Sequence, residues 1–351
     1  MGGTERTLVD LVTGLDRTQF APVVWTIADP GPLASEIPDE IPVRSLEASS
    51  KTDIRVPLRL MKELRAERPE ILQSFLYFDN VLARLVGLAA PETTVITGVR
   101  EVPNSMSPHR ELIDRATLFL SDFIISNSEA GAEWIIDRGA NREVVNVVRN
   151  GRDIDGYNVA IPARYRQTVG IPQGPVVGTV GRLVKRKGHL DLIAAWPTVQ
   201  NEHPDSQLVL VGEGPEREAL ERQTEELGIS DSVHLLGSRH DVPELLALFD
   251  LFVFPSYYEG LPGALLEAMC AGLPIITTPV DGCAELISDE KQGLHIPVGD
   301  SAAIGAAINR LLSDEGLGSK LGENANQRAS ESFSLEVMVE EYCSVYRRFS
   351  Q

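Results

Sequence analysis

Short apolar runs alternate with amphipathic helical segments along most of this 351-residue chain, and this alternation limits the folds open to it. Strands that are separated by helices run parallel, because each crossover returns the chain to the same edge of the sheet. Helices then cover both faces of such a sheet, which suits strands rich in Val, Ile and Leu. Strands are expected at 21–26, 70–75, 94–98, 123–126, 144–148, 176–180, 208–211, 233–236, 251–254 and 274–277. The length allows two domains, each with its own core.

A glycine-marked turn at 258–268 leads out of one of these strands into a helix. Gly260 and Gly263 let the backbone come close to a ligand, and Pro262 suits the first turn of a helix. The first amides of that helix have no partner within it, so they are free to bind an anion. The turn therefore predicts an anion site.

Two carboxylates, Glu259 and Glu267, flank this turn, one before the helix and one about a turn inside it. Carboxylates accept strong hydrogen bonds from sugar hydroxyls, while free amides suit phosphate, and a nucleotide sugar carries both kinds of group. The alternative is that two glutamates of an acidic chain simply face solvent, and the spacing alone favours that alternative.

A second stretch, 176–189, has the pattern of a strand, a glycine turn and a group of cations that opens a helix. Together with the glutamate pair it resembles the retaining GT-B glycosyltransferases of family 4. The family's E-x7-E pair corresponds here to Glu259 and Glu267, and its phosphate-binding residues correspond to Gly181, Arg182, Lys187 and Gly188.

The resemblance covers nearly the whole chain and implies an α/β fold of the GT-B class, with two Rossmann-like parallel-sheet domains facing each other across a cleft. The family's hinge occurs at 150–153, where Arg152 replaces the usual apolar residue. The implied domains are an N-terminal acceptor-side domain, 1–155, joined by the C-terminal helix 335–351, and a nucleotide-sugar domain, 156–334.

The start of the chain departs from the family pattern. A first strand normally precedes the family's G-G-x-E-R loop, and here that loop begins at Gly2. The first strand of the N-terminal sheet is therefore expected to be missing, which would leave its two neighbours with unpaired ladders.

The resemblance also implies a role for each site residue. Arg182 and Lys187 would hold the donor diphosphate and neutralise the charge that builds on the leaving nucleotide, unless they only form an exposed basic turn. Glu259, the third catalytic residue, would bind hydroxyls of the transferred sugar, and Glu267 would bind those of the ribose. The donor-binding residues would be Gly2, Gly3, Gly181, Arg239, Gly260, Leu261, Pro262, Gly263 and Glu267, with a solvated loop cation as the alternative for Arg239.

The acceptor side is less defined. Family members often carry a histidine after the strand that corresponds to 71–75, and this chain has none there. Arg100 and Glu101, after the next strand, are the remaining candidates, with ordinary polar loop residues as the alternative. The D-x-D spelling at Asp153 and Asp155 is explained by turn chemistry, and no histidines have ligand spacing, so no metal ion is expected.

The implied reaction moves a sugar, with retention of anomeric configuration, from a nucleotide-diphosphate donor to a glycan, lipid-linked or small-molecule acceptor, as in envelope polysaccharide or glycoconjugate synthesis. A hexosyltransferase of this type needs no metal or cofactor, because cations and a helix terminus stabilise the leaving group. Two alternatives stay open. One is a nucleotide-sugar 2-epimerase on the same fold, which would need a further acid/base pair, and the other is a non-catalytic homologue that binds nucleotide sugars.

Charge narrows the partners. The net charge of −19 argues against nucleic acid, because a reader of the phosphate backbone needs a basic surface. Lysine is scarce beside arginine and the acidic residues, which favours a salt-adapted protein over a merely acidic one.

Three cysteines without paired metal spacing, and no signal-peptide or membrane-span pattern, indicate the cytoplasm. One amphipathic segment is basic and predicts peripheral contact with the inner face of a membrane or with a lipid-linked acceptor, with a solvated helix face as the alternative. Its cations are Arg55, Arg59, Lys62, Arg65 and Arg68.

Overall fold

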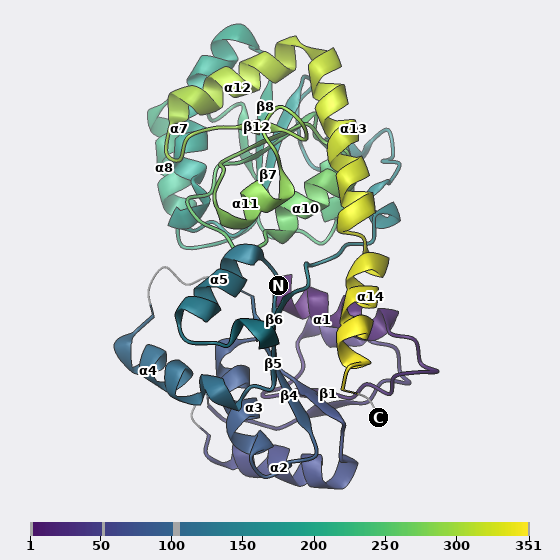
Figure 1. Cartoon of the computed structure of the whole chain (residues 1–351). Helices are drawn as coiled ribbons and strands as arrows, with labels where there is room; N and C mark the ends of the chain where they lie inside the picture. Colours follow the sequence, from purple (N-terminus) through teal and green to yellow (C-terminus); the bar gives the residue numbers. More distant parts are fainter. Residues whose placement is uncertain (1–2, 51–52, 101–105, 350–351) are drawn as a thin grey trace. The chain divides into compact units, whose positions relative to one another are not determined.

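The computed structural model describes residues 3–50, 53–100 and 106–349, and the chain forms two compact units (Figure 1). Unit 1 comprises Met1–Gly151 and Leu335–Gln351, and unit 2 comprises Arg152–Ser334. The chain enters unit 2 after Gly151 rather than after residue 155. The reason is that Ile154 and Tyr157 already pack against the core of unit 2.

Unit 1 contains a parallel four-stranded sheet, which the sequence pattern predicts. Its strands, in spatial order, are β3 (Ile71–Gln73), β4 (Thr94–Val99), β5 (Phe123–Ser126) and β6 (Val145–Val147). A separate parallel pair consists of β1 (Val24–Thr26) and β2 (Val43–Ser45). In the described parts of the chain β1 pairs only with β2 and β3 only with β4, so no strand joins the two sheets.

Helices cover both faces of the four-stranded sheet because successive strand residues point to opposite sides. Ile96 of β4 lies in one core, on the face covered by the first and last helices of the chain. The preceding residue, Val95, lies in a second core, on the face covered by the second and third helices. The first core is formed by α1 (Gly3–Gly14) and α14 (Leu335–Tyr346), and the second by α2 (Arg55–Glu67) and α3 (Tyr77–Gly87). The remaining α-helices are α4 (Pro108–Thr117) and α5 (Glu129–Asp137), and the 3-10 turns are η1 (Pro32–Glu36), η2 (Leu118–Leu120) and η3 (Arg142–Val144).

Unit 2 contains a parallel six-stranded sheet, again as predicted. In spatial order its strands are β12 (Leu294–His295), β11 (Ile275–Thr277), β10 (Leu251–Phe254), β7 (Val176–Val180), β8 (Gln207–Val211) and β9 (Val233–Leu235). The strand order reverses between β7 and β10. The carboxyl ends of these two strands therefore meet at the topological switch point, where open α/β sheets bind ligands.

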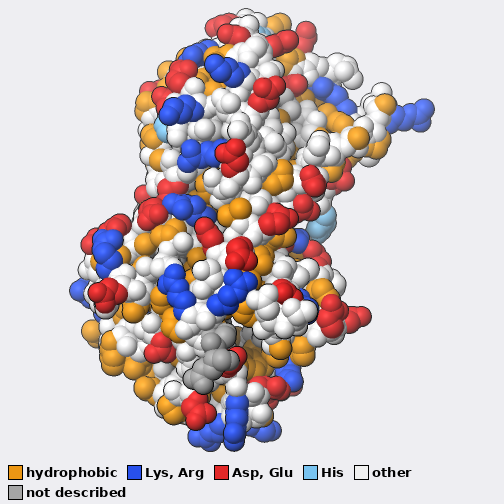
Figure 2. All heavy atoms as spheres, turned by 45° about the vertical axis from the view of Figure 1, so that its right-hand side comes forward, with side chains coloured by type: hydrophobic (Ala, Val, Ile, Leu, Met, Phe, Trp, Pro, Cys, Tyr) orange, Lys and Arg blue, Asp and Glu red, His pale blue; other side chains and the backbone are white. Residues whose placement is uncertain are grey.

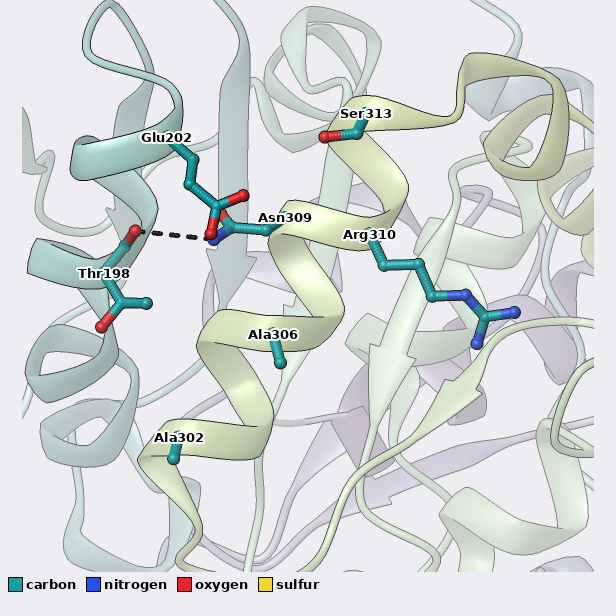
Figure 3. A pocket seen from close by; sticks show the side chains of 7 residues that line it. All are labelled: Thr198, Glu202, Ala302, Ala306, Asn309, Arg310 and Ser313. Atoms are coloured by element: carbon teal, nitrogen blue, oxygen red, sulfur yellow. Dashed lines mark hydrogen bonds between the residues drawn. The ribbon is translucent and has the colours of Figure 1, made fainter.

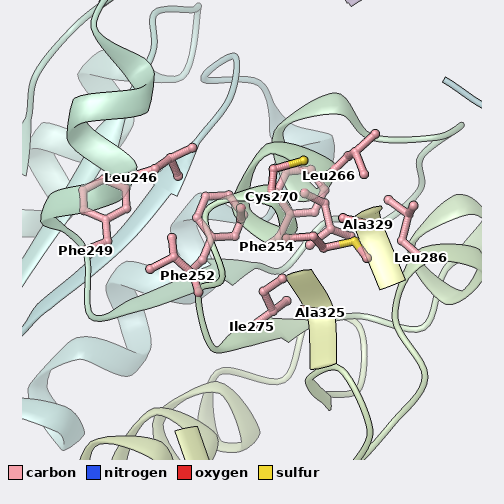
Figure 4. Close-up of a cluster of buried hydrophobic side chains, with 14 of the residues drawn as sticks. Leu246, Phe249, Phe252, Phe254, Leu266, Cys270, Ile275, Leu286, Ala325 and Ala329 are labelled. Atoms are coloured by element: carbon pink, nitrogen blue, oxygen red, sulfur yellow. The ribbon is translucent and has the colours of Figure 1, made fainter. Parts of the chain in front are cut away.

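Two hydrophobic cores sandwich this sheet. On one face Phe252 and Phe254 pack against a layer of helices that includes α10 (Figure 4). On the other face Leu251 and Val253 pack with Trp196 and its helix. The α-helices of unit 2 are α6 (Tyr165–Thr168), α7 (His189–Glu202), α8 (Arg217–Glu226), α9 (Val242–Leu248), α10 (Gly263–Cys270), α11 (Asp281–Leu286), α12 (Ser301–Ser313) and α13 (Glu315–Ser332). None of the helices in the described chain is both long and apolar enough to cross a bilayer.

Candidate active site

The loops after β7 and β10 touch each other through a glycine. Gly188 has φ of +67°, a left-handed conformation that favours glycine, and a Cβ atom there would lie 2.1 Å from the backbone oxygen of Pro255. The same loop after β7 carries the short 3-10 turn η5 (Lys185–Lys187). Its cations are thereby brought to the turn that follows β10.

Glu259 in that turn is held by two of these cations. Its Oε1 lies 2.6 Å from Nζ of Lys187, and its Oε2 lies 3.1 Å from Nη1 of Arg186. Glu259 is only 6% exposed, so the pairing compensates for the loss of hydration of its carboxylate. The sequence predicts both Lys187 and Glu259 as site residues, and the structure shows that they contact each other directly.

Lys187 itself is a buried cation. It is 8% exposed, and its Nζ lies 4.5 Å from the ring centroid of Phe254. Burial lowers the pKa of Lys187, and the carboxylate of Glu259 opposes that shift. Glu259 and the aromatic face are therefore what keep a cation at this position.

Arg182 differs from Lys187 in being exposed and in having no side-chain partner in the described residues. The backbone before it is fixed, because Gly181 donates its N–H to Val211 O. Gly212 stands with φ of +145°, and a Cβ atom there would lie 1.9 Å from Gly181 O. Of the two cations that the sequence predicts to bind the diphosphate, Lys187 is therefore buried and Arg182 is exposed to solvent.

Glu267 lies inside α10, whose N-cap residue is Pro262. Its Oε1 is 3.3 Å from Nε of Arg152, the residue that departs from the family's hinge pattern. Gly263, at the start of the helix, packs directly against this arginine, since a Cβ atom there would lie 2.6 Å from Arg152 Nη2. The sequence interpretation assigned that glycine to close approach by a ligand, and the structure adds an internal reason.

The other glycine of the turn, Gly260, meets α11. A Cβ atom on Gly282 would lie 1.7 Å from Gly260 O, so backbone packs directly on backbone here. Leu261 and Pro262 are buried. The turn from Glu259 to α10 is consequently held by packing along its whole length.

The Arg239 side chain is 33% exposed and pairs with Asp241, and in the described residues it has no contact with the cluster around Glu259. Its Nε and Nη2 donate to the two carboxylate oxygens of Asp241 at 2.8 and 2.6 Å, and Tyr165 donates its hydroxyl to the same carboxylate at 2.8 Å. These hydrogen bonds, with that from Arg239 the largest, lower the pKa of Asp241 to about 2.

His189 is a buried residue of this region to which the sequence analysis gave no role. It opens α7 directly after the cations, is buried, and its Nδ1 has no hydrogen-bond partner in the described chain. Burial, with a smaller contribution from Lys187, lowers the pKa of His189 to about 4, so the ring is neutral at pH 7.

On the acceptor side, Arg100 is engaged within unit 1. Its Nη1 donates to Asn150 Oδ1 at 3.0 Å, its Nη2 donates to the hydroxyl of Tyr342, and its guanidinium lies 5.0 Å from the ring centroid of Phe75. Gly3 is the first residue of α1. The predicted residues Gly2 and Glu101 lie outside the described residues.

The described residues contain no group of three or more His, Cys, Asp or Glu side chains that could hold a metal ion. Figure 3 shows a shallow pocket of about 430 Å³ on unit 2, between α7 and α12, and none of the predicted site residues lines it. Among its polar lining residues, Asn309 donates its amide nitrogen to Thr198 O at 3.5 Å.

Two parallel-sheet units in one chain, one of them doubly wound with cations and carboxylates at its switch point, are typical of the GT-B class of glycosyltransferases. Residues 1–155 match the model for "Glycosyltransferase Family 4", and residues 163–328 match that for "Glycosyl transferases group 1". The chain belongs to this family, as its motifs predict.

Curated relatives agree with this family, and a solved structure agrees with the fold. The chain is 28% identical over 295 residues to the lipopolysaccharide core biosynthesis glycosyltransferase LpsE of Rhizobium meliloti (strain 1021), covering 82% of this chain and 79% of LpsE. It is 35% identical over 173 residues to LpsD of the same organism, covering 49% of each protein. The crystal structure of Anabaena HepE in complex with UDP superimposes with a TM-score of 0.87 at 23% identity, covering 99% of this chain and 96% of HepE. The predicted fold class is thereby confirmed.

Proposed function

We propose that this protein is a retaining hexosyltransferase that moves a sugar from a nucleoside-diphosphate donor to a glycan or lipid-linked acceptor of the cell envelope. The names of LpsE and LpsD, which act in lipopolysaccharide core synthesis, support an envelope acceptor. The complex of HepE with UDP suggests UDP as the first nucleotide to test.

One observation carries the proposal, namely the buried contact of Lys187 with Glu259 beside the exposed Arg182. Cleavage of the donor leaves negative charge on the departing diphosphate, and preorganised cations stabilise that charge. Lys187 and Arg182 supply two such cations without a metal ion. Glu259, which fixes the first of them, would also accept hydrogen bonds from hydroxyls of the transferred sugar.

The reaction we infer keeps the leaving group and the acceptor on the same face of the sugar. The bond between the anomeric carbon and the phosphate oxygen breaks, and the bond between that carbon and the acceptor oxygen forms. The acceptor hydroxyl loses its proton to the departing phosphate oxygen, so no protein base is needed. This route agrees with the absence of a histidine after β3.

The test is donor turnover. Purified protein is incubated with UDP-, GDP- and ADP-sugars and a panel of free and lipid-linked glycans, and release of the nucleoside diphosphate is measured together with the anomeric configuration of the product by NMR. Release with an α-linked product, reduced at least about 100-fold in Lys187→Met, is expected. Arg310→Met, which removes an exposed ion pair with Glu290, is the matched control.

Two other outcomes of this assay would favour the alternative functions. A nucleotide sugar inverted at its second carbon would replace the proposal with the epimerase reading. Nucleotide binding without any turnover would leave a non-catalytic homologue.

We further propose that unit 1 contacts an anionic membrane. Of the exposed large apolar side chains that the structure describes, those of unit 1 far outnumber the two of unit 2, Leu227 and Val298. They lie on α2, α3, α4 and η2, which are neighbours in contact, and Figure 2 shows apolar side chains at several places on the surface of unit 1. These side chains are Ile54, Leu58, Leu76, Phe78, Leu85, Leu88, Leu112, Ile113 and Phe119.

The basic segment on α2 is smaller than the sequence predicts. Arg55 binds Asp53 at 2.8 Å, and Arg59 donates to the backbone oxygens of Leu46 and Glu47. Its exposed cations without an ion pair in the described chain are Lys62, Arg65 and Arg68. The chain as a whole carries a net charge of −19, so a local group of cations beside exposed apolar side chains is unusual in it. Such a surface favours binding to a membrane with anionic headgroups over exposure to water.

Cosedimentation with vesicles tests this contact. The wild-type protein should sediment with vesicles of phosphatidylglycerol and phosphatidylcholine but not with phosphatidylcholine alone. Leu58→Asp combined with Lys62→Glu should abolish binding, whereas Leu227→Asp in unit 2 should not. Equal sedimentation of all three proteins would contradict the proposal.

All three cysteines are free and buried, which fits a cytoplasmic location at the inner face.

A further inference from the structure

Arg152 stands at the first residue of unit 2, directly after the chain leaves unit 1. Its backbone N–H donates to Phe333 O at 3.0 Å, and it forms a parallel bridge with Ser334, the last residue of unit 2. The segments that lead into and out of unit 2 are therefore bonded to each other at this residue.

The side chain of Arg152 reaches from this point to the first turns of α10. Its Nε lies 3.3 Å from Glu267 Oε1, and the arginine side chain is 4% exposed against 19% for the glutamate. The second carboxylate oxygen of Glu267, Oε2, accepts no hydrogen bond in the described chain. Glu267 is the more exposed of the two residues, so this oxygen can accept hydrogen bonds from a ligand. The Gly263 position has no room for a Cβ atom beside Arg152 Nη2, so the guanidinium is closely confined.

We propose that Arg152 is a positioning residue for the donor nucleotide. It holds Glu267 by one carboxylate oxygen so that the other accepts hydrogen bonds from the ribose hydroxyls. It does not itself contact the diphosphate, because its side chain is buried behind the glutamate. The inference rests on the proposed function, and it gives a reason for an arginine where the resembled family has an apolar residue.

The structure links this positioning to the connections between the units. The residue that orients the ribose-binding carboxylate is also the residue whose backbone joins 333–334 to the entering segment.

The experiment compares nucleotides with and without ribose hydroxyls. UDP, GDP and ADP are titrated calorimetrically into the wild-type protein, and the tightest is compared with its 2′,3′-dideoxy analogue. Arg152→Met should weaken binding of the ribonucleotide about tenfold, the size of one hydrogen bond to a charged group. Its affinity for the dideoxy analogue should stay within about twofold of wild type, and in a Glu267→Gln background the substitution should have no further effect.

Controls separate positioning from folding. Arg310→Met should bind both nucleotides like wild type. Arg152→Lys, which keeps a cation beside Glu267, should weaken binding of the ribonucleotide less than Arg152→Met and leave the dideoxy analogue unaffected, and it carries the test if Arg152→Met does not fold. An equal loss for the ribonucleotide and the dideoxy analogue would overturn the inference, because it would mean contact with the phosphates or general damage. A wild-type protein that binds no nucleotide would overturn the proposed function and this inference together, whereas normal wild-type binding with an unaffected Arg152→Met overturns the inference alone.

Discussion

The Nζ atom of Lys187 lies 2.6 Å from Oε1 of Glu259, and both residues are more than nine-tenths buried. Two charges at this depth compensate each other's lost hydration, and either charge alone would be costly. Arg186, on the more exposed side of the carboxylate, completes the group. This contact gives the first prediction.

Glu259→Ala should lower the free energy of unfolding by roughly 3–5 kcal/mol, because it leaves Lys187 buried without its carboxylate. The double variant Glu259→Ala, Lys187→Met should recover a large part of that loss, although it stays inactive. Urea denaturation of the two single variants, the double variant and wild type measures the coupling. Strictly additive losses would show that the two charges do not depend on each other.

The neutral His189 predicts a pH dependence of stability. Its pKa falls from 6.5 to about 4 on folding, so the unfolded chain binds more protons between these values. Its contribution to stability is fully present above about pH 6.5 and is lost as the pH falls toward 4. Wild type should therefore lose more stability over this range than His189→Gln, as measured by Tm against pH.

Asp79 supplies the control for that measurement. Burial raises its pKa to about 6 in the folded protein, from 3.8. The folded chain then binds the additional proton, so its contribution is present below about pH 3.8 and is lost as the pH rises toward 6. Asp79→Asn should change the pH slope in the opposite direction to His189→Gln. Slopes that change in the same direction would contradict the assignment of both groups.

Salt should stabilise this protein. With a net charge of −19 the folded chain repels itself, and counterions screen that repulsion. We expect Tm to rise by several degrees between about 0.1 M and 1 M potassium chloride, where the Debye length falls from about 10 to 3 Å. A variant with several surface glutamates changed to glutamine should respond less. A Tm that stays constant or falls would remove the hypothesis of salt adaptation.

Arg100 gives a prediction that separates two roles. If it serves only to join Asn150 to Tyr342, then Arg100→Met and Tyr342→Phe should both lower Tm, with little change in the acceptor KM of the folded protein. A role in acceptor binding would instead raise the acceptor KM in Arg100→Met alone. Thermal melts and acceptor titrations on the two variants distinguish these outcomes.

The fold could be predicted from the sequence because the strands of a parallel sheet are buried on both faces and are therefore continuously apolar, even when they are short. Runs such as 176–180 and 251–254 are buried on both faces, and their composition shows it. The strands that the pattern missed are β2, with the residues Val-Arg-Ser, and β12, with only Leu294 and His295. Edge strands this short have no periodicity to detect.

The site followed only in part. The motif residues Lys187 and Glu259 were predicted individually, but their contact joins two loops that meet only because β7 and β10 are neighbours. The pair of Arg152 and Glu267 was equally inaccessible, since the two residues are far apart in the chain. The only signal in the sequence is that Arg152 departs from the family pattern. That departure does not indicate which residue the arginine contacts.

The arrangement of α1 against α14 has a consequence for how the protein is made. Unit 2 is one continuous segment, 152–334, whereas the core of unit 1 contains both Leu11 and Tyr342. A ribosome therefore completes every residue of unit 2 before unit 1 has its last helix. A stop codon shortly after residue 334 would leave unit 2 with its full cores and would deprive unit 1 of a large part of one core. The core of the N-terminal unit thus depends on residues that are translated after the whole of unit 2.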